Sequence, residues 1–273
     1  MTNDALAFPD WADAHVPLSG ADEAYFGRDV LQGLVDGIDQ AARAQTTDRR
    51  WGAAVLGCSL WMDDPDLIAV LRQMANVCVV VTKQERRKYK SEAFQALAAF
   101  AQDKGLAHEA YPELHEFAVP REGGPLEVGP GTPPWWEDQG IPAVREAGFR
   151  KSGNRLVPIV HAKIALLGHM IWTDEHPSGY PVDELHFIPD RLWIGSANFT
   201  RASRSSLEMG VWLSDKQLMD AARRFLLALI SLSEPLGQGP DHLEPELQPV
   251  EYDDEAFLEY LHEVRGLSVD SAD

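Results

Sequence analysis

Cysteine is scarce in this sequence, which contains only Cys58 and Cys78 among its 273 residues. Two cysteines are too few to form a zinc site by themselves. Both lie in apolar runs with the character of strands, so we expect reduced thiols inside the core rather than a disulfide. Reduced thiols in turn predict a cytoplasmic protein.

Basic residues are also few, because Lys and Arg total 24 against 43 Asp and Glu, and the net charge is −19. This balance favours solubility and opposes spontaneous binding to nucleic acid or to an anionic membrane. Contact with a polyanion would require a local basic patch, and the dense basic stretch is TKQERRKYK (82–90). Lys83, Arg86 and Arg87 are therefore candidates for contact with a phosphate backbone, the alternative being a solvated loop.

Long apolar runs are absent as well. No run reaches the roughly 18 residues that a membrane span needs, so we expect no membrane partner. The first 15 residues, MTNDALAFPDWADAH, lack a basic segment followed by an apolar core, and no signal peptide is expected.

What the sequence does contain is an alternation of buried strands and helices. WGAAVLGCSLW (51–61) and VCVVV (77–81) predict buried strands, and the second is continuously apolar, as in a parallel sheet covered on both faces. Helices are predicted over 65–75 and 91–105, and a third strand over LHEFAV (114–119). This order indicates α/β layering.

The remaining elements complete one domain over residues 22–231, between an N-terminal extension (1–21) and an acidic C-terminal extension (232–273). The extension after 231 is expected to contain one short helix. Further elements of the domain are predicted from apolar periodicity and capping residues. They are helices over 22–45 and 214–231, and strands over 156–167, 191–200 and 206–214.

Two segments between these elements have unusual composition. Residues 120–156 are rich in Gly and Pro and predict a long loop. Residues 169–190 contain five carboxylates and no Lys or Arg, which suits a lid, a polyanion mimic or a plain surface loop. The three histidines in this second segment have no compact ligand spacing, so no metal site is predicted there.

The motif HAK (161–163) places two polar side chains inside an aliphatic run. In a strand, residues two apart project from the same face, so His161 and Lys163 are expected about 7 Å apart along the chain. An imidazole and an ammonium would repel each other if both were charged. A shared anionic ligand such as a phosphate removes that conflict.

A second motif, GSAN (195–198), supplies groups that such a ligand needs. Gly195 permits close approach of the backbone, Ser196 offers a hydroxyl, and Asn198 offers an amide donor. Glu208, in the following predicted strand, can accept a proton from one imidazole nitrogen and fix the tautomer of the ring.

An H-x-K motif followed by G-S-x-N and a downstream Glu resembles the phospholipase D superfamily, whose signature is H-x-K-x4-D with G-S-x-N. The resemblance covers about residues 25–231 and implies a mixed sheet sandwiched by helices, with one motif per chain. The sequence departs from the pattern at Gly168, where the motif has Asp, and at Ser206, where Asn is usual.

The resemblance implies a phosphodiester exchange that needs neither metal nor cofactor. His161 would attack phosphorus and form a phosphohistidine, while a second histidine protonates the leaving oxygen and then activates water. Lys163, Ser196 and Asn198 would hold the phosphoryl oxygens, and Glu208 would orient His161.

That mechanism requires two histidines, yet of nine in the chain only His161 is followed two places later by Lys. We therefore predict a homodimer that shares one site across a two-fold axis.

Three functions remain open at this point. The first is a nuclease that cleaves DNA or RNA, in a restriction or phage-defence system, with a protein partner that delivers the substrate to this acidic chain. The second is a phospholipase or phosphatidyl transferase. The third is an inactive module that binds a partner through the fold, its site lost at Gly168 and Ser206.

Overall fold

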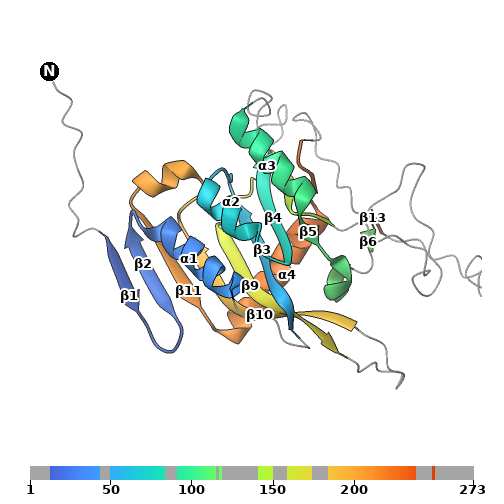
Figure 1. Cartoon of the computed structure of the whole chain (residues 1–273), viewed down its shortest axis with the longest axis horizontal. Helices are drawn as coiled ribbons and strands as arrows, with labels where there is room; N and C mark the ends of the chain where they lie inside the picture. Colours follow the sequence, from blue (N-terminus) through green and yellow to red (C-terminus); the bar gives the residue numbers. More distant parts are fainter. Residues whose placement is uncertain are drawn as a thin grey trace, which may run out of the picture.

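The computed structural model describes residues 13–43, 50–83, 91–114, 117–118, 141–149, 159–173, 184–237 and 248–249 (Figure 1). The strands in chain order are β1 (Ala14–Pro17), β2 (Glu23–Gly27), β3 (Arg50–Ser59), β4 (Asn76–Lys83), β5 (Gly105–Leu106), β6 (Phe117–Ala118), β7 (Ile141–Pro142), β8 (Val144–Phe149), β9 (Ile164–Thr173), β10 (Glu184–Gly195), β11 (Glu208–Leu213), β12 (Glu234–Pro235) and β13 (Gln248–Pro249). The helices are α1 (Val30–Ala42), α2 (Pro65–Leu71), α3 (Glu92–Asp103) and α4 (Lys216–Ser231), and the 3-10 turns are η3 (His108–Ala110), η4 (Pro112–Leu114) and η5 (Arg201–Ser205).

Nine strands form one mixed sheet in the order β1-β2-β11-β10-β9-β3-β4-β8-β12. β3, β4 and β8 run parallel, and the remaining neighbours in this sheet are antiparallel. The predicted fold class, a mixed sheet sandwiched by helices with one motif per chain, is therefore confirmed.

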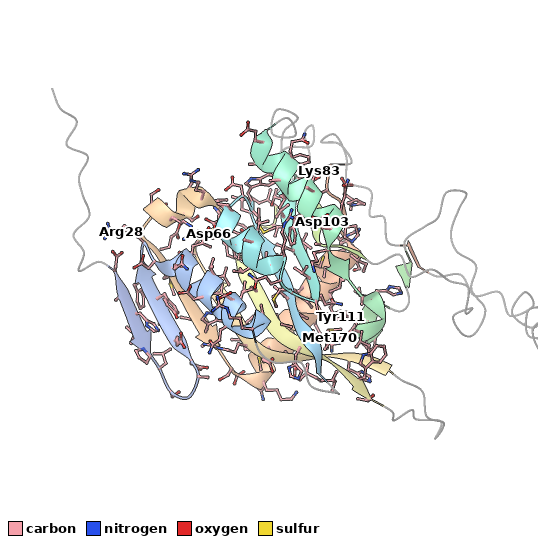
Figure 2. All side chains as sticks on the ribbon, in the orientation of Figure 1. Arg28, Asp66, Lys83, Asp103, Tyr111 and Met170 are labelled. Atoms are coloured by element: carbon pink, nitrogen blue, oxygen red, sulfur yellow. The ribbon has the colours of Figure 1, made fainter. Side chains whose placement is uncertain are left out.

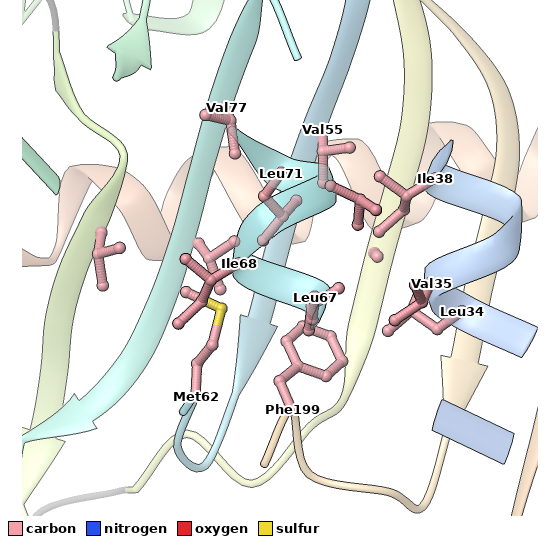
Figure 3. Close-up of a cluster of buried hydrophobic side chains, with 14 of the residues drawn as sticks. Leu34, Val35, Ile38, Val55, Met62, Leu67, Ile68, Leu71, Val77 and Phe199 are labelled. Atoms are coloured by element: carbon pink, nitrogen blue, oxygen red, sulfur yellow. The ribbon is translucent and has the colours of Figure 1, made fainter. Parts of the chain in front are cut away.

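Helices cover both faces of this sheet, with α1, α2 and α3 in front of it and α4 behind it (Figure 1). On the front face, Leu34 and Ile38 of α1 and Leu67 of α2 pack toward Val55 and Val77 of the two central strands (Figure 3). On the back, α4 buries its apolar stripe against β10, β9 and β3. β4 is buried along its whole length because it is covered from both sides, as its continuous apolar run predicts.

The third strand of the predicted α/β unit is placed wrongly by the sequence. β8 lies beside β4 instead, and Phe117–Ala118, which lie within the predicted 114–119 strand, form β6 outside the nine-stranded sheet. Residues 112–114 form η4, and Leu114 is buried against the back of the sheet. An apolar run this short fits a buried turn as well as a strand.

Two further boundaries differ from prediction. The helix expected from residue 22 begins at Val30, because Glu23–Gly27 form β2, which pairs with β1 of the expected N-terminal extension. The described parts of segment 169–190 are paired strands, since β9 continues to Thr173 and β10 starts at Glu184.

The chain returns to the sheet after α4, beyond the predicted domain end at residue 231. β12 pairs with β8, and a buried ion pair joins Glu234 to Lys83 of β4. Arg145 donates to the hydroxyl of Ser233 at 2.6 Å, and Glu146 accepts the N–H of Gly237 at 3.0 Å. These charged contacts attach the start of the acidic extension to the core, whereas the helix predicted near 253–265 lies outside the described residues.

Candidate active site

The two sequence motifs meet at one end of the central sheet. β9 begins just after HAK (161–163), β10 ends at Gly195, and Ile164 pairs with Ile194 across these antiparallel neighbours. The N–H of Gly195 donates to the carbonyl of Lys163 at 3.1 Å. The turn containing GSAN (195–198) therefore lies directly beside HAK.

The sequence predicts that HAK lies within a strand. In the structure it lies instead in a segment that crosses the end of the sheet before β9 begins. Ile159 bridges to β8, and the hydroxyl of Thr82 in β4 bonds both backbone groups of Val160, at 2.9 and 3.0 Å. Four residues later, Ile164 pairs with Cys58 of β3. The crossing places His161 and Lys163 outside the carboxyl ends of parallel strands, where α/β sheets bind ligands.

The side chains of His161 and Lys163 come together at this crossing. The Nζ atom of Lys163 lies 3.3 Å from Nδ1 and 3.5 Å from Nε2 of His161, and it donates to the His161 carbonyl at 2.6 Å. His161 is exposed, whereas Lys163 is only 6% exposed. A substrate can therefore reach the imidazole, with the ammonium buried behind it.

The environment of Lys163 makes its ammonium a poorly solvated cation. Burial lowers the pKa of Lys163 below the ordinary lysine value, partly opposed by the negative charge of Glu208. Among the described residues, no carboxylate lies within ion-pair distance of Nζ. A bound anion would supply the missing countercharge.

Ser196 is tied to the start of β11. Its hydroxyl donates to a carboxylate oxygen of Glu208 at 2.5 Å and accepts the N–H of Met209 at 2.9 Å. Its own N–H donates to the Met209 carbonyl at 2.9 Å. The predicted contact of Glu208 with His161 is absent from the described contacts, and the carboxylate instead positions Ser196.

Gly195 and Asn198 complete the turn. A Cβ atom at Gly195 would lie 3.0 Å from the Met209 carbonyl oxygen, so glycine allows the two backbones to approach more closely than a larger residue would without a shift. The Oδ1 atom of Asn198 is buried, and no described group bonds it. An amide in this position has hydrogen-bonding capacity left for a ligand or a water molecule.

The turn is held by residues that motif analysis misses. The hydroxyl of Ser59 accepts the N–H of Phe199 at 3.1 Å. The N–H groups of Asp63 and Asp64 donate to the carbonyl of Phe199. Arg204 forms an ion pair with Asp64, at 2.5 Å. Asp64 also caps α2 by accepting the N–H of Leu67. Arg204, its ion-pair partner, lies in η5, a turn that has no local sequence signal.

The two departures from the motif have different structural contexts. A Cβ atom at Gly168 would lie 2.2 Å from the carbonyl oxygen of Ile188 and 2.6 Å from the ring of Phe187, so β9 has no space for an aspartate there. The hydroxyl of Ser206 makes only a long contact, 3.5 Å from the Ala202 carbonyl, and its N–H donates to the Ser203 carbonyl at 3.2 Å. Ser59, Asp63 and Asp64 hold the turn in place of any contribution from residue 168.

The predicted basic contacts are not found where the sequence suggests. Lys83 is the last residue of β4, only 3% exposed, and its ion pair with Glu234 withdraws it from any substrate (Figure 2). The expectation of an exposed loop residue is wrong at this position. Arg86 and Arg87 lie outside the described residues.

Within the described part of the chain, no three His, Cys, Asp or Glu side chains cluster closely enough to hold a metal ion. His169 contacts Asp190 at 2.8 Å, and His186 contacts Thr173 at 3.1 Å. No described helix has the length and apolarity required to cross a membrane.

Known proteins with a similar arrangement are found among solved structures. No protein-family model matches the chain, and no curated protein matches it. NucT from Helicobacter pylori is similar at 12% identity and a TM-score of 0.45, over 79% of this chain and 98% of that one. Nuc from Salmonella typhimurium, a phospholipase D family member, is similar at 13% identity and a TM-score of 0.41, over 78% and 97%. Polyphosphate kinase from Porphyromonas gingivalis is similar at 12% identity and a TM-score of 0.43, over 82% and 27%.

Proposed function

We propose that this protein is a phosphodiesterase that cleaves DNA or RNA through a covalent phosphohistidine, without a catalytic metal. The observation that carries the proposal is the exposed imidazole of His161 beside the buried, carboxylate-free ammonium of Lys163. A nucleophile next to a poorly solvated cation suits an anionic, electrophilic phosphorus centre. The side-chain N–H₂ group of Asn198 in the neighbouring GSAN turn adds a donor for the phosphoryl oxygens, whereas the Ser196 hydroxyl is donated to Glu208.

The reaction consists of two displacements at phosphorus. In the first, a ring nitrogen of His161 forms a bond to phosphorus, the P–O bond to the leaving group breaks, and a second imidazolium protonates the departing oxygen. In the second, that imidazole removes a proton from water, whose oxygen attacks phosphorus as the P–N bond breaks. Lys163 stabilises the negative charge of both transition states.

The second imidazole is proposed to come from another copy of the chain, giving a homodimer with one shared site. A two-fold contact places each residue near its own symmetry mate. An exposed apolar face adjoins the site and suits such a contact. Its main members are Phe26 on β2 and Met209 on β11, which are register partners, and Val16 on β1, with exposures of 42, 46 and 41%.

This apolar face has no cover within the described chain. α1 packs on the opposite side of β11 and β2, where Trp212 donates to the Gly33 carbonyl at 3.1 Å, and α4 lies over β10, β9 and β3 instead. Met209 also bonds Ser196 through its backbone, so the face begins at the site itself. Burying it against a second copy would bring both sites toward the same interface.

The acidic charge of the chain bears on substrate delivery. A net charge of −19 repels a free polyanion at long range, so we propose that a partner protein presents the nucleic acid. A cytoplasmic role in restriction or phage defence, where such partners occur, is part of the same proposal and rests on the family resemblance.

A substrate panel tests the chemistry. Labelled DNA, labelled RNA and phosphatidylcholine are incubated with the protein, with and without EDTA. We expect cleavage of nucleic acid that persists in EDTA, is lost in His161→Ala and is retained in His169→Ala, a matched change at a histidine paired to Asp190. Acidic conditions are avoided in the mass analysis, because the P–N bond of phosphohistidine is acid-labile. Alkaline quenching should show one adduct on the His161 peptide, a phosphoryl group that still carries the retained fragment of the substrate.

The same panel separates the alternatives. Release of choline without nucleic-acid cleavage would establish the alternative of a phospholipase or phosphatidyl transferase. An absence of turnover on all three substrates would leave a binding module.

Sedimentation velocity tests the shared site. The wild type should be a dimer at micromolar concentration, and Met209→Arg should be a monomer without activity. Leu232→Arg adds the same charge at another exposed apolar position and should remain dimeric. A monomeric wild type that still cleaves its substrate would refute the shared site.

A further inference from the structure

A groove lies beside the proposed site, between α2, α3 and η5, and has a volume of about 810 Å³. Small apolar side chains form most of its lining, including Ile68 and Ala69 of α2 and Ala93 and Ala96 of α3. Pockets of this size accommodate drug-sized ligands, and a lining of small residues leaves room for a flat group.

The wall of the groove is bonded to the residues that directly follow the GSAN turn. Asp63, on its wall, donates its N–H to the Phe199 carbonyl and accepts the N–H of Arg201 at 3.0 Å. Arg201 follows Asn198 by three residues, so their Cα atoms are at most about 11 Å apart. One or two nucleotide units span a distance of this order.

The two arginines of η5 have different roles. Arg204 is occupied by Asp64 and Asp66, with contacts at 2.5 and 3.1 Å. The side chain of Arg201 is exposed at the groove, and no carboxylate of the described chain pairs with it. In a chain of net charge −19, an unneutralised guanidinium beside an anion-binding site suits a second phosphate.

The opposite wall limits the charge of the ligand. Glu92 lines the groove at the start of α3, and Arg72 lies within the groove but is paired with Asp103 at 3.1 Å. Among the described residues, the groove therefore offers the guanidinium of Arg201 as its unpaired cation, the carboxylates of Asp63 and Glu92 at its walls, and an apolar surface between them. A single phosphate followed by an uncharged planar group matches this pattern better than a run of phosphates.

We propose that the groove binds the nucleotide next to the scissile phosphate, with its phosphate at Arg201 and its base against Ile68, Ala69 and Ala96. The inference rests on the proposed nuclease activity. A base packed between two helices cannot remain paired in a duplex, so the substrate class is single-stranded nucleic acid. Apolar contact with the base carries little sequence information, and discrimination among bases is expected to be weak.

The test uses two substrates, of which only one is long enough to extend from the scissile position into the groove. A single-stranded oligonucleotide extends into the groove, whereas bis(4-nitrophenyl) phosphate occupies only the scissile position. Ala96→Trp fills the groove and should lower kcat/KM for the oligonucleotide at least tenfold without changing that for the small diester. Ala99→Trp is the matched control, since Ala99 is an exposed alanine of α3 outside the groove and its replacement should change neither.

The charge at Arg201 is tested separately. Arg201→Ala should lower kcat/KM for the oligonucleotide about tenfold, as expected for the loss of a charge-assisted hydrogen bond, and Arg201→Lys should recover part of it. The backbone bond to Asp63 is unaffected by either change. A duplex of the same sequence should be cleaved more slowly than the single strand by the wild type.

The outcomes distinguish failure of the groove from failure of the activity. If the small diester is cleaved but Ala96→Trp leaves oligonucleotide cleavage unchanged, or the duplex is the better substrate, the groove inference is overturned. If neither substrate is cleaved, the proposed function fails, and the groove is judged by fluorescence anisotropy with a labelled ten-nucleotide single strand. Equal affinities of wild type and Ala96→Trp would then overturn it, and weaker binding only by Ala96→Trp would support it.

Discussion

Replacing Glu234 by Gln should destabilise the protein without impairing catalysis. The change removes the carboxylate of Glu234 from the ammonium of Lys83, which is only 3% exposed. Breaking a buried ion pair from one side costs about 3–5 kcal/mol of unfolding free energy. For a chain of this size that corresponds to a fall in Tm of roughly 6–20 °C.

Urea unfolding followed by tryptophan fluorescence measures this cost, with midpoint and slope fitted for each variant. The control is the double variant Lys83→Met with Glu234→Leu, which removes both charges and should recover most of the loss, because apolar replacement of a whole buried pair is often neutral. A Glu234→Gln protein within about 1 kcal/mol of the wild type would refute the reasoning. So would a stably folded Lys83→Met protein with a raised KM for nucleic acid, since that result would restore Lys83 to the substrate site.

Three further predictions follow from single side chains. Gly168→Asp, which restores the family motif, should destabilise the fold by about 3 kcal/mol or more and raise no activity, because its Cβ would lie 2.2 Å from the Ile188 carbonyl oxygen; a soluble, more active variant would contradict this. Because burial lowers the pKa of Lys163, kcat/KM should fall on the alkaline side at a pH below the ordinary lysine value of 10.5. Lys163→Arg should move this fall to higher pH. An unchanged pH profile would show that the ammonium of Lys163 takes no part in the reaction. Burial raises the pKa of Cys58 and Cys78 to about 12, so neither thiol should react with Ellman's reagent in the native protein and both should react in urea; rapid native labelling would show that one of them is accessible.

The central strands and helices were predictable because each has a local signal. The continuous apolar run of VCVVV (77–81) indicates burial on both faces, and Asp64 before Pro65 marks the start of α2. Burial of both cysteines as free thiols was predicted for the same reason. Elements whose partner is distant in sequence were not predictable. β8 lies within a segment whose composition resembles a loop, and it becomes a strand because β4 offers it an open edge.

The candidate site shows the same division. HAK and GSAN carry recognisable residue types at fixed spacing, so their proximity followed from two strands entering one sheet. The crossing geometry of HAK did not, because it depends on one hydroxyl, that of Thr82, 78 residues earlier in the chain. The partner of Glu208 was also unpredictable. From the sequence alone, either Ser196 or His161 could bond the Glu208 carboxylate. The backbone pairing of Ser196 with Met209 places the Ser196 hydroxyl beside that carboxylate.

The distribution of charge links this site to its acidic surroundings. Several cations elsewhere in the described chain have carboxylate partners, among them Arg28 with Asp13 and Arg223 with Glu113. Lys163 and Arg201 have no such partner among the described residues, and both lie at the end of the sheet where the two motifs meet. An acidic protein that neutralised every cation internally would repel a phosphodiester at all distances. Leaving these two unneutralised gives short-range attraction at one place, while the net charge of −19 still opposes binding elsewhere. Raising the ionic strength should therefore screen the long-range repulsion before the buried contact at Lys163, so that moderate salt increases the rate of cleavage of a free oligonucleotide instead of decreasing it.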